Sequence, residues 1–113
     1  MAAHPLKNSA DFKRLARSGK KCVLPAFILQ AQRRPDAAAP FRLGLTVSRK
    51  VGNAVARNRA KRRLRALVRL YETPEKLEGW DIVLIARATA QERDFALLKQ
   101  DFTQGLEKTG VAA

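Results

Sequence analysis

The sequence has few of the residues from which most catalytic and metal sites are built. It holds one cysteine, Cys22, and one histidine, His4, in 113 residues. A single cysteine excludes an internal disulfide framework and a cysteine-based zinc knuckle, and a single histidine argues against histidine-based metal or nucleophile chemistry. No apolar run approaches the roughly 18 residues of a membrane span, and residues 1–20 lack the apolar core of a secretory signal. We expect a soluble protein of a reducing compartment, most simply the cytoplasm.

Acidic residues are also scarce, and they are unevenly placed. The chain has 10 Asp and Glu against 23 Lys and Arg, which gives a net charge of +13. Residues 1–71 contain 18 basic and 2 acidic residues, whereas residues 72–113 contain 5 basic and 8 acidic ones. This segregation predicts one surface that faces a polyanion, either nucleic acid or an anionic membrane, beside a scaffold-like C-terminal third. An idle basic surface is disfavoured, because self-repulsion would destabilise the folded state with nothing to offset it.

The hydrophobic pattern predicts one domain that contains helices and strands. Hydrophobic residues make up 46% of the chain, so it can build a core, and its length suits one domain rather than two. We expect a single domain over 1–113, with 1–6 and 109–113 frayed. Three segments have helical patterns: 9–18, 54–71 and roughly 91–107. Three runs have strand patterns: 22–32, 41–48 and 81–87. The expected core aromatic residues are Phe27, Phe95 and Phe102.

Local signals set the expected ends and neighbours of these elements. Ser9 is the expected N-cap of the first helix, and Asn53 is the expected N-cap of the long helix. The short loop at 33–40 contains two prolines and an aspartate, and it predicts an antiparallel hairpin between the first two strands. The run at 81–87 predicts a strand that is buried on both faces. The expected order is α-β-β-α-β-α, with room for a further strand within 22–48.

The helix over 54–71 has an apolar side and a wide cationic side. At about 100° per residue, five residues fall together on the apolar side: Ala60, Leu64, Leu67, Val68 and Tyr71. Five others fall roughly opposite: Asn58, Lys61, Arg62, Arg65 and Arg69. Arg59 and Arg63 lie on a flank, and Arg57 lies near the edge of the apolar side. Cations at this spacing repel one another, and phosphates remove that penalty. The helix therefore predicts a phosphate-binding face.

The chemistry of the chain favours an RNA-binding cofactor over a nuclease that works alone. The sequence offers no paired carboxylates or histidine clusters to hold a catalytic metal or act as a general base. Two rivals remain: a basic ribosomal protein, which would cosediment with ribosomal subunits, and a DNA-binding module that places the basic helix in a major groove. A membrane-surface role is less favoured, because the helix lacks an apolar face with bulky aromatic residues.

The stretch from Gly44 to Arg65 resembles the signature of the bacterial ribonuclease P protein family. That family carries an Arg-Asn-Arg box followed by Lys-Arg on a helix, here at 57–59 and 61–62. A Gly-Leu-x-Val-Ser-x-Lys strand end precedes the helix, here at 44–50. Two further segments fit the family: the last strand at 81–87, and the first helix with Asp11-Phe12 and Gly19. The resemblance covers about 6–106, nearly the whole chain.

The resemblance implies a fold and a function. The implied fold is an α/β (α+β) two-layer sandwich, with a small mixed four-stranded sheet, about three helices and a left-handed β-α-β crossover, which departs from the usual right-handed rule. The implied function is that of the protein subunit of ribonuclease P, which removes the 5′ leader of precursor tRNA. In that family a large RNA is the catalyst and holds most of the Mg²⁺, and no catalytic or metal-binding residue of the protein is expected. The implied partners are that RNA and precursor tRNA, with no membrane and no required protein partner.

The resemblance also implies site residues by position. Ten residues match the RNA-binding region: Ser48, Arg49, Lys50, Arg57, Asn58, Arg59, Lys61, Arg62, Arg65 and Arg69. Phe12 and Gln30 match positions of a cleft that holds the single-stranded leader between the first helix and the sheet. Ala16 and Gln30 stand where some members have aromatic residues, so we expect weaker stacking on leader bases here.

Overall fold

The computed structural model describes residues 4–6 and 8–111. Its strands are β1 (His4–Pro5), β2 (Lys20–Val23), β3 (Phe27–Arg33), β4 (Arg42–Thr46) and β5 (Trp80–Ala86). Its helices are α1 (Ser9–Ser18), α2 (Ala54–Arg69) and α3 (Phe95–Lys108), with three 3-10 turns, η1 (Arg49–Val51), η2 (Pro74–Leu77) and η3 (Ala88–Gln91). The strands form one sheet in the order β1-β4-β5-β3-β2. The mixed α and β fold class is confirmed, with five strands instead of four.

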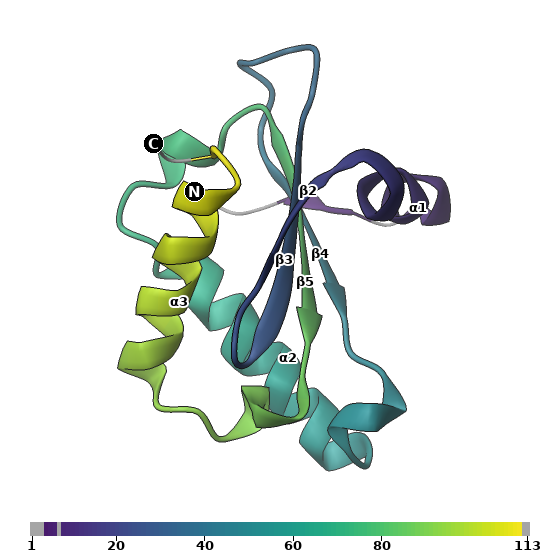
Figure 1. Ribbon diagram of the computed structural model, residues 1–113, viewed down its shortest axis with the longest axis vertical. Helices are drawn as coiled ribbons and strands as arrows, with labels where there is room; N and C mark the ends of the chain where they lie inside the picture. Colours follow the sequence, from purple (N-terminus) through teal and green to yellow (C-terminus); the bar gives the residue numbers. More distant parts are fainter. Residues whose placement is uncertain (1–3, 7, 112–113) are drawn as a thin grey trace.

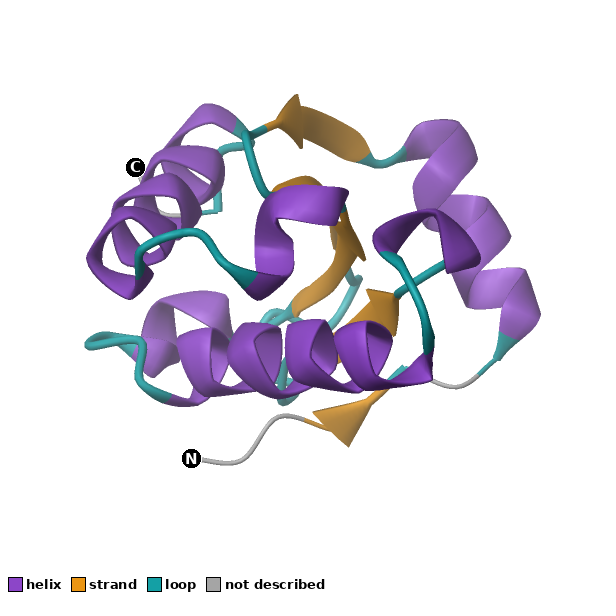
Figure 2. Ribbon diagram, turned by 90° about the horizontal axis from the view of Figure 1, so that it is seen from below, coloured by secondary structure: helices purple, strands orange, loops and turns teal. Residues whose placement is uncertain are grey.

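The helices cover the two faces of the sheet unequally. Helix α1 lies on one face, and α2 and α3 lie on the other (Figure 1), so that the strands run between them in the view from below (Figure 2). The main core fills the space between the sheet and α2 and α3, and it includes Phe27 and Phe102, as the sequence predicted. A smaller buried cluster of Leu6, Leu15 and Val83 lies under α1. The face that carries α1 is therefore covered by one helix and is left partly open.

The predicted hairpin between the first two strands is wrong. Strand β5 lies between β3 and β4, pairing antiparallel with β3 and parallel with β4. The physical reason is the composition of β5, whose apolar residues need cover on both faces and so occupy the centre of the sheet. The predicted strand over 22–32 is in fact two strands, β2 and β3, which pair as a tight antiparallel hairpin around Pro25.

The long helix begins where the sequence predicted. Asn53 is its N-cap, and the side-chain oxygen of Asn53 accepts a hydrogen bond from the Ala56 amide at 2.9 Å. Gly52 turns the chain into the helix with φ 146°, and a Cβ added there would lie 2.9 Å from the Cβ of Ala56. The N-cap of α1 is Asn8 rather than Ser9, because the Asn8 side chain accepts from the Ala10 amide and Ser9 is already helical.

The ends of the chain differ from the sequence prediction. His4 and Pro5 pair with β4, and Leu6 is buried, so 4–6 is not frayed. Thr109 and Val111 are also buried, and residues 1–3 and 112–113 of the segments predicted to fray lie outside the described residues. The last helix begins at Phe95 with Asp94 as its N-cap, while η3 forms a separate turn before it. None of the helices in the described segments combines the length and the apolarity that a membrane crossing requires.

Candidate nucleic-acid interface

Helix α2 separates its apolar and cationic sides as predicted. Four residues of the predicted apolar side are buried against the sheet and its neighbours: Ala60, Leu64, Leu67 and Val68. Tyr71, just past the helix, packs edge-on against Phe102 with ring centroids 5.4 Å apart. This burial fixes the rotation of the helix about its axis, so its cations are presented to solvent as a set.

The ten residues predicted to bind RNA lie on α2 and on the segment that leads into it. Eight of them are exposed: Ser48, Arg49, Lys50, Asn58, Arg59, Arg62, Arg65 and Arg69. Arg57 and Lys61 are half-buried. A shallow outer groove of about 440 Å³ runs along this side of α2, and it is lined by Val55, Asn58, Lys61, Arg62 and Arg65. Within residues 4–6 and 8–111, no ion pair engages a cation of α2, so the exposed cations of this helix have no carboxylate partner.

Arg63 differs from the other arginines of α2. Its Nη1 donates a hydrogen bond to the Ala90 carbonyl oxygen at 2.9 Å, and its Nη2 donates to the carbonyl oxygen of Arg93. Both acceptors lie in the segment between β5 and α3. Arg63 therefore ties α2 to that segment, and its charge is not presented with the exposed set.

The two residues predicted to contact the leader share the α1 face of the sheet, with a strand between their positions. The ring of Phe12 lies over Gly44 of β4, where an added Cβ would come within 2.6 Å of Phe12 Cζ. Gln30 of β3 is only 6% exposed. Register pairing places Val83 of β5 between Gly44 and Gln30, and Val83 is buried with Leu15 of α1.

An open row of side chains crosses the same face of the sheet, two residues further along the strands from the row of Gly44, Val83 and Gln30. The row follows the pairing of four strands and consists of Thr46, Ile85, Ile28 and Val23. Ile28 and Ile85 are half-buried, while Val23 is 61% exposed. The open row is a mostly apolar strip with solvent access, a surface on which unstacked bases can lie.

Sequence analysis missed a buried carboxylate, Asp81, at the start of β5. Arg42 donates to it from Nε at 2.7 Å and from Nη2 at 2.6 Å, and Arg14 donates from Nη2 at 2.8 Å. Arg34 places its Nε 3.3 Å from the carboxylate. Asp11 of α1 joins the same cluster through Arg14 and Arg42. We call these five residues the Asp81 cluster; it joins α1 to the strands.

Two opposing effects act on the carboxyl group of Asp81. Burial alone would raise its pKa, but the hydrogen bonds from Arg42 and Arg14, together with the positive charges of Arg42 and Arg34, hold the pKa below its ordinary value. The same bonds raise the pKa of both arginines. A carboxylate near the start of an otherwise apolar strand was a signal in the sequence for such a cluster. The sequence did not show which arginines surround this carboxylate.

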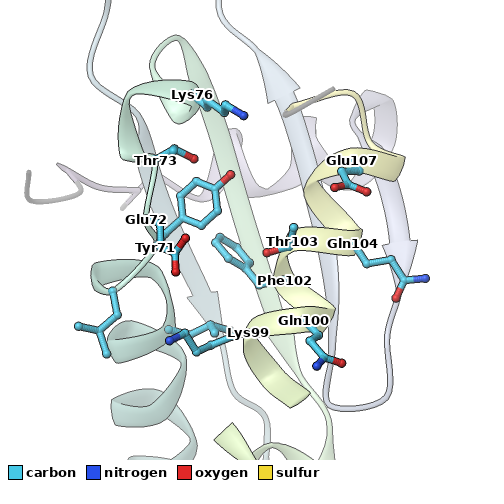
Figure 3. A pocket seen from close by; sticks show the side chains of 12 residues that line it. Tyr71, Glu72, Thr73, Lys76, Lys99, Gln100, Phe102, Thr103, Gln104 and Glu107 are labelled. Atoms are coloured by element: carbon cyan, nitrogen blue, oxygen red, sulfur yellow. The ribbon is translucent and has the colours of Figure 1, made fainter. Parts of the chain in front are cut away.

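A larger hollow lies elsewhere, between the end of α2 and α3 (Figure 3). It has a volume of about 630 Å³, and both signs of charge line it, with Glu72 and Glu107 beside Lys76 and Lys99. This mixture does not share the one-sided charge of α2, so the hollow is not part of the cationic surface.

The carboxylates of the described segments do not assemble a metal site. No group of three or more Asp, Glu, His or Cys side chains gathers among these residues. Asp81 and Asp11 lie close together, but their oxygens are engaged by arginines, which repel a divalent cation. The side chains of the described residues therefore do not offer a ligand set for a protein-held Mg²⁺.

Comparison with known proteins shows the family of the chain. The model of the Ribonuclease P family matches residues 1–110. The chain is 49% identical to a ribonuclease P protein component of Gluconacetobacter diazotrophicus, over 96% of this chain and 93% of that protein. It is 43% identical to one of Paramagnetospirillum magneticum, over 94% and 82%. The structure of the Staphylococcus aureus RNase P protein superposes with a TM-score of 0.80 at 29% identity, covering 98% of this chain and 99% of the other. The chain belongs to the ribonuclease P protein family.

Proposed function

We propose that this chain, as the protein component of ribonuclease P, binds the catalytic RNA through the exposed cations of α2 and of 48–50. The observation that carries the proposal is the set of α2 cations that face solvent without carboxylate partners in the described segments. Phosphates supply the missing counter-charge, and arginine can bind each one through two parallel hydrogen bonds. Asn58 lies in the outer groove among these cations and can donate to a phosphate or a base edge.

We further propose that the leader of precursor tRNA crosses the α1 face of the sheet. The open row of Thr46, Ile85, Ile28 and Val23 gives unstacked bases an apolar strip on this face. Phe12 borders this row over Gly44, and its contact with the leader stays a prediction. Gln30 is buried under α1, which adds to the expectation of weak base stacking at that position.

In this proposal the RNA performs the cleavage and the protein holds the two RNAs together. Mg²⁺ held by the RNA would supply an activated water and charge stabilisation for the leaving oxygen, and no side chain of this chain is assigned to hold it. The basic side chains of the protein take over part of the charge neutralisation that free cations otherwise provide. The protein therefore promotes endonucleolytic removal of the leader, which produces the mature 5′ end of the tRNA.

Reconstitution tests this function. The catalytic RNA of ribonuclease P from the organism that encodes this chain is mixed with precursor tRNA over a range of Mg²⁺ concentrations, with and without the protein. We expect the protein to stimulate cleavage most at low Mg²⁺, because its cations then replace scarce counterions. We expect no cleavage by rigorously RNA-free protein. Site-specific cleavage by the protein alone, or no stimulation at any Mg²⁺ concentration, would refute the proposal.

A further inference from the structure

A pocket at the edge of the sheet shares rim residues with the RNA-binding set of α2 but is a separate hollow from the outer groove. It has a volume of about 430 Å³ and opens between β1, β4 and α2. Apolar side chains line most of it, including Leu6, Leu43, Leu45 and Val68, and Phe12 forms the wall on the α1 side. We call it the edge pocket. Its size falls within the range of roughly 300–1,000 Å³ that is common for ligand sites.

The short length of β1 leaves hydrogen-bonding groups at the edge pocket. Strand β1 pairs only with Arg42 and Leu43, and the Leu6 amide donates to the Leu43 carbonyl oxygen at 2.9 Å. In a parallel strand, alternate residues point their peptide groups to the same side, so the peptide group of Leu45 faces the β1 side as that of Leu43 does. Within the described residues, no strand pairs with β4 there. The edge pocket thus combines an apolar floor with a peptide donor and acceptor.

The rim of the edge pocket is cationic. Lys61, Arg65 and Arg69 line it from α2 at steps of four residues, which corresponds to about 6 Å per step along the helix. The described residues that line the pocket include no acidic one. Lys61 and Arg65 also line the outer groove, so the two hollows share a row of cations and form one continuous path across α2.

We propose that the edge pocket holds one unstacked nucleobase of the catalytic RNA, with the flanking phosphates on Lys61, Arg65 and Arg69. A base matches the apolar floor, the ring of Phe12 and the open peptide groups of β4, and a phosphate backbone matches the rim. The catalytic RNA is the source because the three rim cations belong to the helix on which that RNA is placed, whereas Phe12, the residue predicted to contact the leader, contributes only one wall of the pocket. The inference rests on the proposed function of α2.

A pair of oligonucleotides separates base binding from phosphate binding. The full chain, labelled with ¹³C at Leu and Val methyl groups and with ¹⁵N, is titrated with a six-nucleotide adenosine RNA and with the same backbone lacking its bases. We expect ring-current shifts of the Leu43 and Leu45 methyl signals with the first RNA only, and shifts of α2 amides with both. Absent methyl shifts would overturn the edge-pocket proposal, while absent amide shifts would overturn the placement of RNA on α2.

Filling the pocket tests the source of the base. Leu45→Trp occupies the edge pocket, and Leu97→Trp, at an exposed position of α3, is the matched control. We expect Leu45→Trp to weaken binding of the catalytic RNA by about fivefold or more, the effect of one lost base–aromatic stack, with an unchanged salt dependence. Equal affinities of the two variants would overturn the proposal.

Two further arms keep the result interpretable. Precursor and mature tRNA are bound to each variant, and a loss confined to the precursor would assign the pocket to the leader and overturn the choice of the catalytic RNA. Melting curves accompany each measurement. Leu45→Phe, a smaller filling, replaces Leu45→Trp if the larger side chain prevents folding, with the same expected direction and a smaller fold-change.

Discussion

The arginines of the Asp81 cluster and the arginines of α2 carry the same charge but have different partners. Arg14, Arg34 and Arg42 surround one buried carboxylate at 2.6–3.3 Å. Arg59 and Arg62 on α2 are exposed, and no ion pair engages them within the part of the chain that the structure describes. The difference teaches that net charge does not locate a binding surface. A polyanion is expected to bind where exposed cations have no carboxylate partner.

Register and composition produce this division. Arg42 is the direct cross-strand partner of Asp81 in the parallel pair of β4 and β5, so strand pairing brings the two charges together. No acidic residue occurs between Asp36 and Glu72, so α2 contains no carboxylate that could pair with its cations. The cluster beneath α1 therefore serves folding, while the cations of α2 are available to a ligand.

The largest expected effect comes from removing the carboxylate of the Asp81 cluster. Asp81→Asn leaves three arginines crowded without their counter-charge, and we expect a loss of about 3 kcal/mol in the free energy of unfolding at pH 7. This is the low end for a broken buried pair, because Arg14 and Arg42 keep contact with water. Urea unfolding measures the loss, with Glu78→Gln as an exposed control that changes little. A loss no larger than that of the control would contradict the role of the cluster.

The same variant has a predicted pH dependence. Because the folded-state pKa of Asp81 is lowered, its stabilisation is complete above its unfolded-state pKa of about 4 and is lost as the pH falls through the folded value. The difference in stability between the natural protein and Asp81→Asn should therefore shrink below about pH 4. Unfolding curves at pH 7 and at acidic pH test this, and a constant difference would argue against a charged Asp81.

The next effect concerns the position of α2. Gly52→Ala places a side chain at φ 146°, where it also collides with Ala56, so we expect a loss of about 2 kcal/mol in stability. Gly110→Ala is the control, because its φ is 81° but nothing lies within 4 Å of an added Cβ. We also expect Gly52→Ala to weaken RNA binding, because the exposed cations of α2 must be held in place to bind. Equal stability losses in both variants would mean that the collision contributes nothing.

Two neighbouring arginines give the most direct test of the division. We expect Arg63→Ala to lose about 1–2 kcal/mol of stability, because the Arg63 side chain donates hydrogen bonds to the carbonyl oxygens of Ala90 and Arg93. The same variant should keep most of its RNA affinity. Arg62→Ala, like Arg59→Ala, should do the opposite and lower the log–log slope of the salt dependence by about 0.7–0.9 for each lost phosphate contact. Lys99→Ala on α3 should change neither property. Similar losses of RNA affinity in all these variants would indicate diffuse charge rather than a defined face.

The smallest expected effect separates the two proposed RNA surfaces. Val23, in the open row, and Val55, in the outer groove, are 61% and 75% exposed, so Val23→Glu and Val55→Glu place the same charge on different faces. We expect Val23→Glu to cost about 0.5–1 kcal/mol of binding to precursor tRNA relative to mature tRNA. Val55→Glu should instead weaken binding of the catalytic RNA by a similar amount. Interchanged or identical effects would place the leader and the catalytic RNA differently.

The sequence by itself determined the helix at the centre of the candidate site. The spacing of Ala60, Leu64, Leu67 and Val68 fixed which side is buried, because a helix repeats every 3.6 residues. Asn53 fixed its start through a hydrogen bond to a residue three positions away. Such signals are local, so they could be read from the chain. The exposure of Arg59, Arg62 and Arg65 followed from the same periodicity.

Only the tertiary structure decided how distant segments meet. The insertion of β5 between β3 and β4 depends on which strand the whole core can cover on both faces, and no local pattern encodes that choice. The Asp81 cluster, the bonds of Arg63 to the segment before α3, and the edge pocket beside the short β1 all follow from that strand order. Local periodicity sets the faces of each element, but the choice of neighbours depends on burial and strand pairing summed over the whole chain.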